Sequence, residues 1–300
     1  MMGVESMTLL GLGRSALIPT VLAWGTLVMA VAGQEVGGRD PAGPPGDLRI
    51  ADRVPADNSI VEHPLMPAIR WAYSGIQDIQ KIQDYSAVMV KRERIGDRLN
   101  DPEYMFIKVR HNPMSVYMYF LEPAALKGQE VIWVEGRNDG KMWAHPGGIR
   151  NRLIGTVSLD PTGPIAMQGN RYPITEIGVL NLVRRLIEVG EQDSQYGECE
   201  VKFFEGAKIN DRVCTCIQVV HPVPRRNFRF HLARIYVDKE LNLPIRYESY
   251  DWPREPGGKP QLIEEYTYLN VKINNGFTDE DFDIRNPKYN FRGKDASDKE

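Results

Sequence analysis

The chain lacks the short motifs that mark the common hydrolases and nucleotide-binding enzymes. None of the strings G-x-S-x-G, H-E-x-x-H or the P-loop occurs in its 300 residues. Histidine is scarce, and the five copies show no metal-ligand spacing to one another, to cysteine or to aspartate: His63, His111, His145, His221 and His231. The sequence therefore indicates no catalytic residue, no metal site and no cofactor, and we expect a protein that is not an enzyme.

An excess of charge of one sign is also missing. Lys and Arg number 37 against 40 Asp and Glu, which gives a formal net charge of -3. No long basic stripe is present. Such a mildly acidic chain argues against nucleic acid as the main partner.

Long apolar runs are confined to the N-terminus. Residues 16–32 are almost all apolar or small, follow Arg14 and end in an A-x-A pattern, which together are typical of a secretory signal peptide. Pro19 interrupts the run, which is also short for a transmembrane helix. We expect a signal peptide at 1–32 and a periplasmic or otherwise exported mature protein, with an uncleaved anchor as the alternative.

The composition after this run predicts one folded domain between two tails. Residues 33–60 are rich in Gly, Pro and Asp with few large apolar side chains, which is typical of a flexible linker. Residues 61–292 have an ordinary globular composition and are expected to form a single domain. The last residues, 293–300, are predicted to be a disordered tail.

Two helices are predicted from apolar side chains at steps of three and four residues. The first spans 64–82, with Pro64 and Pro67 in its first turn. The second starts after Pro173, spans 174–189 and stops at Gly190. The apolar stripes consist of Leu65, Ile69, Ala72, Ile76 and Ile79 in the first and Val179, Leu182, Val183, Leu186 and Val189 in the second.

Strand signals dominate the remainder. Apolar residues alternate with others in 103–111 and 114–121, and His111-Asn112-Pro113 between them predicts a turn. Further strand-like runs are 198–204, 213–220, 227–237, 245–251 and 263–273. About ten strands in antiparallel order, without a βαβ rhythm, predict an α+β fold with an antiparallel sheet.

Several segments occur in an order that resembles a known family. A strand at 84–90 follows the first helix, a second strand ends in Phe120-Leu121-Glu122-Pro123, and a hairpin after Gly128 reaches Lys141-Met142-Trp143. Near the end come residues 277–284 and Pro287. This order resembles the LolA/LolB/RseB-like family of exported bacterial lipoprotein-sorting proteins, closest to an uncharacterised branch described as a domain of unknown function. The resemblance implies a curved, unclosed antiparallel half-barrel with helices over its concave face.

The resemblance also implies an apolar hollow that receives acyl chains. Candidate lining residues come from the alternating strands, where methionine suits adaptable apolar sites. The alternation alone does not separate such a hollow from an ordinary packed core. The nine candidates, over which the first helix is expected to lie, are Met105, Ile107, Val109, Val116, Met118, Phe120, Ile132, Val134 and Met142.

The function expected on this basis is non-enzymatic binding in the cell envelope, with a lipid, an acyl chain or a lipid-modified protein as cargo. The alternative is a sensor or interaction module that docks a membrane-bound regulatory protein, and a hydrolase that uses one histidine is a third hypothesis.

Three arginines surround an aromatic residue near the middle of the second half of the chain. They are Arg225, Arg226 and Arg229, around Phe228. They predict a docking patch for an acidic partner or lipid headgroups, or a charged strand edge exposed to water.

Cysteine is limited to Cys199, Cys214 and Cys216. Export would place them where disulfides persist. A hairpin that turns near 206–211 brings Cys199 opposite the other two, and a turn centred on 207 and 208 pairs it with Cys216. A disulfide from Cys199 to Cys216 is therefore predicted in preference to one from Cys199 to Cys214, with three reduced, buried cysteines as the alternative.

Overall fold

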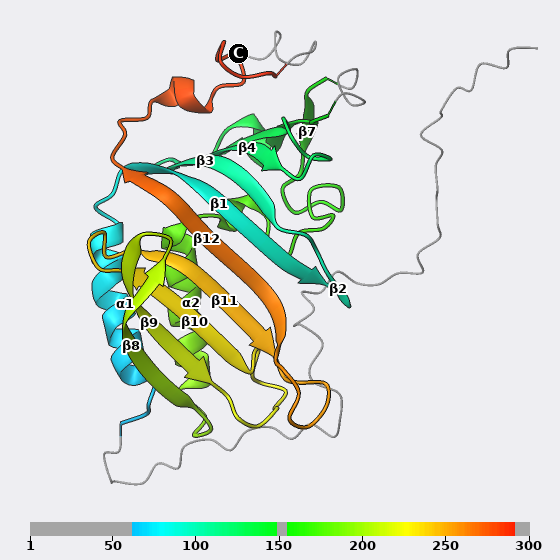
Figure 1. Ribbon diagram of the computed structural model, residues 1–300. Helices are drawn as coiled ribbons and strands as arrows, with labels where there is room; N and C mark the ends of the chain where they lie inside the picture. The colour runs from blue at the N-terminus through cyan, green and yellow to red at the C-terminus, as the bar shows by residue number, and fades with distance from the viewer. Residues whose placement is uncertain (1–61, 149–154, 292–300) are drawn as a thin grey trace, which may run out of the picture. The chain divides into compact units, whose positions relative to one another are not determined.

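One antiparallel sheet organises the protein. The computed structural model describes residues 62–148 and 155–291. Eleven of its 12 strands follow the order β7-β6-β5-β4-β3-β1-β12-β11-β10-β9-β8, and the twelfth, β2, pairs with β1 (Figure 1). Because β7 and β8 are edges that do not pair with each other, the sheet is not closed. The predicted signal peptide, linker and C-terminal tail lie outside the described residues.

The strands fall into two runs along the chain. The first run is β1 (Asp84–Ile95), β2 (Arg98–Leu99), β3 (Glu103–His111), β4 (Met114–Glu122), β5 (Glu130–Val134), β6 (Met142–His145) and β7 (Val157–Leu159). The second run is β8 (Glu200–Ile209), β9 (Arg212–Val220), β10 (Leu232–Asp238), β11 (Pro244–Asp251) and β12 (Gln261–Ile273). The first strand, β1, and the last, β12, pair in the middle of the sheet. The predicted α+β class with an unclosed antiparallel sheet is confirmed.

The first helix, α1 (Met66–Ile79), is shorter at both ends than the predicted 64–82. Pro67 lies in its first turn, where a missing N–H is tolerated. Leu65 at the N-cap offers no side-chain hydrogen bond, and neither end carries a charge that complements the helix dipole. Packing of its apolar stripe therefore supplies most of the stability of α1.

The second helix, α2 (Val179–Asp193), starts and ends later than predicted. Residues 174–176 form a 3-10 turn instead, and Gly178 follows with φ of 118°. The Val179 N–H then donates to the Tyr85 hydroxyl at 3.1 Å. Gly190 does not stop the helix, which continues to Asp193. Its missing side chain makes room for Ile69 of α1, since a Cβ there would lie 3.2 Å from Ile69 Cγ1.

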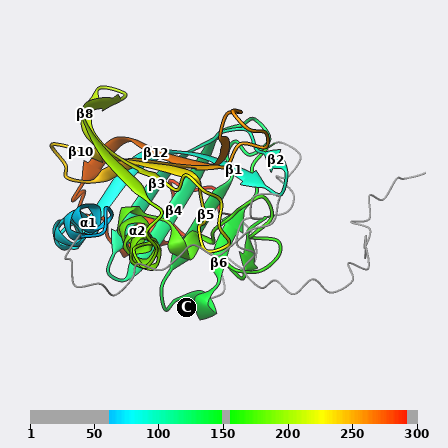
Figure 2. The ribbon, with the colours of Figure 1, turned by 90° about the horizontal axis from the view of Figure 1, so that it is seen from below.

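Both helices pack against the same face of the sheet (Figure 2). Val179, Val183 and Ile187 of α2 share a buried cluster with β1, β3 and β4. Leu65 and Ile69, at the start of α1, pack with β9, β10, β11 and β12. No helix in the described ranges is both long and apolar enough to span a bilayer.

The opposite face of the sheet is partly covered by the C-terminal segment. Phe282 and Phe291 pack there against Tyr117, Ile132 and Val134. The segment includes the short 3-10 helix η4 (Asp279–Phe282), whose capping box joins Thr278 and Asp281. This capping box satisfies backbone N–H groups at the start of η4.

Candidate ligand-binding cavity

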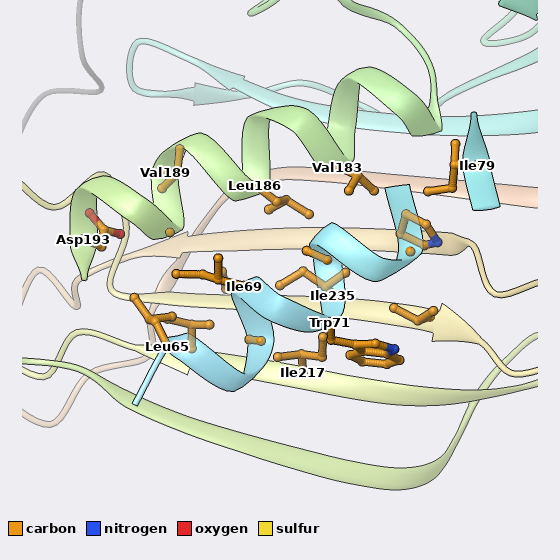
Figure 3. Close-up of a pocket in the computed structure, with 18 of the residues that line it drawn as sticks. Leu65, Ile69, Trp71, Ile79, Val183, Leu186, Val189, Asp193, Ile217 and Ile235 are labelled. Carbon is orange, nitrogen blue, oxygen red and sulfur yellow. The ribbon is translucent and has the colours of Figure 1, made fainter. Parts of the chain in front are cut away.

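A cavity of about 100 Å³ lies between the two helices and strands β9, β10 and β11 (Figure 3). Apolar side chains dominate its lining, among them Leu65 just before α1, Ile69 from α1, Leu186 from α2, and Ile217 and Ile235 from the sheet. The two polar lining residues are Asp193 and Asn242. The site is therefore suited to a mainly apolar ligand.

Small residues on the helices leave this space open. Ala68, Ala72 and Gly75 occupy the cavity side of α1, and a Cβ added at Gly75 would meet no atom within 4 Å. Gly190 of α2 also lines the cavity beside Ile69. The cavity side of α1 thus has small residues between the large side chains of Ile69 near its start and Ile79 at its end.

An aromatic pair borders the cavity next to the sheet edge. Trp71 of α1 lines the cavity and lies 6.3 Å from Phe203 of β8, measured between ring centroids. Phe203 is 44% exposed and is the pairing partner of Ile217, so it projects from the helix-covered face. This pair therefore places an exposed aromatic side chain next to a residue that lines the cavity.

Asp193 introduces a polar group into this lining. The residue is only 3% exposed, and its Oδ2 lies 3.5 Å from Nε2 of the fully buried His221. Burial raises the pKa of Asp193 to about 7, although Arg229 acts in the opposite direction. Burial lowers the pKa of His221 to about 4. Near pH 5–6 both groups are consequently neutral.

The His221 ring is held from two other sides. Its Nδ1 lies 3.1 Å from the Phe230 carbonyl oxygen. Its plane stacks on Phe228, with 3.8 Å between the ring centroids. Because these contacts fix the imidazole, Nε2 points at Asp193 in a rigid arrangement.

The nine residues predicted to line a hollow lie elsewhere, and none of them lines this cavity. Seven belong to the buried cluster that contains α2, namely Met105, Ile107, Val109, Val116, Met118, Phe120 and Met142. The expectation that the first helix covers them is wrong for most of its length, because α2 occupies that position and α1 reaches the cluster with its C-terminal part. A ligand-binding role for these residues stays a prediction.

Ile132 and Val134 project from the opposite face, so grouping them with the other seven was wrong. Ile132 pairs with Tyr117, and Val134 pairs with Ser115. Directly paired residues share a face, and neighbours along a strand alternate. Val131, which is opposite Met118, points toward α2 instead.

Two of the three arginines in the predicted docking patch form hydrogen bonds with other side chains of the protein. The Arg225 guanidinium donates to both carboxylate oxygens of Glu198, at 2.7 and 2.8 Å. Arg229 donates to the Gln192 side-chain oxygen at 3.4 Å, and Arg226 is exposed. Phe228 is buried, so it adds no exposed aromatic surface. A docking role for these arginines stays a prediction.

The predicted disulfide does not form in this arrangement. All three cysteines are free and buried. The β8–β9 hairpin turns two to three residues later than expected, because Ile209 pairs with Arg212. Cys216 therefore faces Phe204, five residues beyond Cys199. At the rise of a strand this is a separation of roughly 16 Å, far beyond the reach of a disulfide.

The sequence interpretation missed Asp193 because the helix was expected to stop at Gly190. The signal was nevertheless present, since Leu186, Gly190 and Asp193 follow one another at steps of four and three along one helix face. Trp71 and Ile217 were missed as well, because they meet only through packing between distant parts of the chain. Within the described residues no group of three or more His, Cys, Asp or Glu is placed to hold a metal ion.

Comparison with known families identifies the class of protein. The family model described as "Protein of unknown function (DUF1571)" matches residues 82–291. The chain belongs to this family, and the branch expected from the sequence is thereby confirmed. No curated protein matches the chain.

Solved structures show weaker similarity. A LolA superfamily protein from Nitrosomonas europaea is 12% identical with a TM-score of 0.28, and covers 70% of this chain and 96% of its own. The Mycobacterium tuberculosis lipoprotein LppX is 11% identical with a TM-score of 0.35, covering 71% and 98%. A DUF1329 family protein from Desulfovibrio piger is 12% identical with a TM-score of 0.36, covering 73% and 97%. At these identities and scores, none of the similarities identifies a ligand for this chain.

Proposed function

We propose that this protein is a non-enzymatic binding protein of the cell envelope that holds an acyl chain, a lipid or a lipid-modified protein. The observation that carries the proposal is the cavity between α1, α2 and β9–β11, whose lining is apolar except for Asp193 and Asn242. The helix-covered face would be the concave face of a half-barrel. Residues 1–32 would direct export and 33–60 would act as a spacer before a single domain at 61–292.

The size of the cavity indicates how a chain would be accommodated. Each methylene removed from water contributes about 0.8 kcal/mol. A volume of about 100 Å³ is below the several hundred cubic ångströms typical of ligand pockets. A long acyl chain would therefore require α1 to move outward from the sheet. The absence of side-chain caps on α1 is consistent with such movement, since apolar contacts are what hold it.

The geometry of the buried histidine supports binding over hydrolysis. A histidine that activates a nucleophile needs one ring nitrogen directed at a hydroxyl or thiol and the other at an orienting group. In His221 one nitrogen faces the Phe230 carbonyl and the other faces Asp193. Neither nitrogen is directed at a nucleophile.

Gly75 provides a direct test, because a long side chain there would occupy the open space beside the cavity. We expect the uncharged apolar probe N-phenyl-1-naphthylamine to bind residues 62–291 with increased fluorescence. Gly75→Met should weaken that binding at least about tenfold. The matched control, Gly75→Ala, adds only a methyl group and should retain binding.

Three outcomes would count against the proposal: no probe binding by the folded wild-type protein, equal affinity in Gly75→Met and Gly75→Ala, or probe binding confined to unfolded protein. Mass spectrometry of the mature protein purified from its envelope would then identify the cargo. Copurifying acyl-chain compounds, reduced in Gly75→Met, are the expected result.

A further inference from the structure

Asp193 is the one ionisable side chain in the lining of the cavity, and it is nearly sealed from water. The other polar lining residue, Asn242, donates its side-chain amide to Asp78 at 3.2 Å. Within residues 62–148 and 155–291, no hydrogen bond reaches the Asp193 carboxyl group, and its nearest partner is His221 Nε2 at 3.5 Å. That nitrogen also has no hydrogen-bond partner.

Such a pair is unfavourable unless something completes it. A buried polar group without a hydrogen bond costs about 1–3 kcal/mol, and a charged one costs more. The surrounding packing nevertheless fixes both groups, since Asp193 ends α2 and His221 is stacked on Phe228. An unsatisfied acceptor that lines a cavity is placed to bind a hydrogen-bond donor from a ligand.

The position of Asp193 gives the cavity two chemically different ends. Figure 3 shows Asp193 at the C-terminal end of α2, with Leu65 and Val189 on the same side of the cavity and Ile79 toward the other. The C-terminus of a helix carries partial negative charge. This end therefore combines an acidic side chain with a helix dipole of the same sign, whereas the rest of the lining is uncharged and, except for Asn242, apolar.

The other charged and titratable groups leave this preference in place. Arg229 attracts the Asp193 carboxylate, but its guanidinium is directed at Gln192. Cys199 interacts with Asp193 and is held as a neutral thiol, because burial raises its pKa to about 12. Around His221 lie His63, His231 and Glu198, and none of them lines the cavity.

We propose that the Asp193 end of the cavity receives the hydrogen-bond-donating, non-anionic head of an amphiphile, such as a hydroxyl or amine on an alkyl chain. This inference rests on the proposed function of the cavity. A hydroxyl can donate to the carboxyl group in either protonation state. An ammonium pairs with the ionised form. A carboxylate, phosphate or sulfate head would instead bring a second negative charge beside Asp193 and the end of α2.

A matched set of decyl compounds tests the preference in the unmodified protein. Decanol, decylamine, decanoate and decyl sulfate share one chain and differ in the head. Each is titrated, below its micelle-forming concentration, against N-phenyl-1-naphthylamine bound to residues 62–291, about one pH unit above the pKa of Asp193. We expect decanol and decylamine to displace the probe at concentrations about tenfold or more below those needed for decanoate and decyl sulfate.

The variant Asp193→Asn links the preference to this residue. It preserves the shape and an acceptor oxygen but removes the charge. Decylamine should lose about tenfold in affinity, decyl sulfate should gain several-fold, and decanol should change little. The melting temperature of Asp193→Asn shows whether this variant is folded. If the variant does not fold, the comparison of the four decyl compounds on the wild-type protein still tests the headgroup preference.

The outcomes separate this inference from the function on which it depends. Probe binding with equal displacement by all four compounds, a preference for anionic heads, or the same preferences in Asp193→Asn would overturn the headgroup assignment alone. Failure of the wild-type protein to bind the probe or any decyl compound would overturn both proposals.

Discussion

At the scale of single residues, Asp193 and His221 show how burial changes two neighbouring groups in opposite directions. An acid and a base that both lose water are both driven toward their neutral forms. The pKa of Asp193 rises to about 7 and that of His221 falls to about 4. Their contributions to the pH dependence of stability consequently have opposite signs.

For Asp193 the folded protein holds a proton that the unfolded chain releases near pH 4. The stability associated with this group is therefore fully present below about pH 4 and is lost as the pH rises through about 7. Asp193→Asn lacks this loss. We expect its unfolding free energy to increase relative to wild type by roughly 4 kcal/mol between these limits, measured by chemical denaturation at a series of pH values.

The opposite slope at His221 is the control. Its folded-state pKa is depressed, so its contribution to stability grows as the pH rises from about 4 to about 6.5. His221→Gln should thus lose stability relative to wild type over the interval in which Asp193→Asn gains. Variants with parallel slopes would show that the two groups are not buried as described.

Met118 and Ile217 form a matched pair that separates packed core from cavity. Met118 is 6% exposed and Ile217 is 7% exposed, but only Ile217 lines the cavity. Truncation of either to Ala should destabilise the protein by about 2–4 kcal/mol. Affinity for N-phenyl-1-naphthylamine should change in Ile217→Ala and stay constant in Met118→Ala, as measured by fluorescence titration. A loss of affinity in Met118→Ala alone would place the ligand under α2 instead.

The sequence could predict that these residues are buried but not which of them border empty space. Residues 115–118 of β4 are buried on both faces, because α2 covers one and the C-terminal segment covers the other. A period of two then no longer distinguishes an inside from an outside. This also explains the error at Ile132, whose burial was expected but whose face was not determined by alternation.

At the scale of elements, the sequence predicted which segments are helices but did not predict the residues at which the helices begin and end. Apolar stripes located both helices, since steps of three and four residues depend only on local sequence. Their ends depend on tertiary contacts that the pattern does not contain. Gly190 lies within α2, where the absence of a Cβ leaves room for Ile69, and α2 begins at Val179, whose N–H donates to the Tyr85 hydroxyl.

The β8–β9 hairpin leads to a prediction about the thiols. Its register separates Cys199 from Cys216 by five residues along β8, and burial raises the pKa values of all three thiols. We therefore expect three free thiols per chain when unreduced protein is denatured and titrated with a thiol reagent. A single free thiol would show that the hairpin adopts the earlier turn and the alternative register.

A carboxylate joins the C-terminal segment to the first strand. Asp84 is 2% exposed and accepts hydrogen bonds from the backbone N–H groups of Asn275, Gly276 and Phe277, at 2.6–3.0 Å. Charge-assisted bonds of this kind contribute about 1.5–3 kcal/mol each, and their effects are not additive. Asp84→Ala should lower the unfolding free energy by about 2–3 kcal/mol and speed proteolysis within residues 277–291.

The control for Asp84 lies in the same segment. The Asp279 side chain is 60% exposed and forms ion pairs with Arg110 and Arg137. Because exposed pairs contribute about 0–1 kcal/mol, Asp279→Ala should have a small effect on both readouts. Equal proteolysis of the two variants would mean that the bonds to Asp84 do not anchor the segment.

At the scale of the whole molecule, part of the cover on each half of the sheet comes from a helix in the other half of the chain. Helix α1 precedes the first run of strands but its first turns pack on β9–β12 of the second run. Helix α2 precedes the second run but packs on β1, β3 and β4 of the first. The cavity lies where the two helices meet the sheet, so it is built from segments far apart in sequence. This is why the sequence predicted an antiparallel sheet with two helices but chose lining residues from β3–β6, whereas the cavity is lined by β9, β10 and β11.

This exchange of helices predicts that neither half of the chain folds alone. Residues 62–148 would expose the face of β1, β3 and β4 that α2 buries, and residues 155–291 would expose the face of β9–β12 that α1 buries. Each fragment would also keep only one strand of the central β1–β12 pair, so that the backbone groups of this strand lose their partners.

We expect each fragment to show no cooperative thermal unfolding by circular dichroism and no binding of N-phenyl-1-naphthylamine. Mixing them in equal amounts should restore both properties in a concentration-dependent way, whereas cooperative unfolding of either fragment by itself would show that the cover from the other half is dispensable.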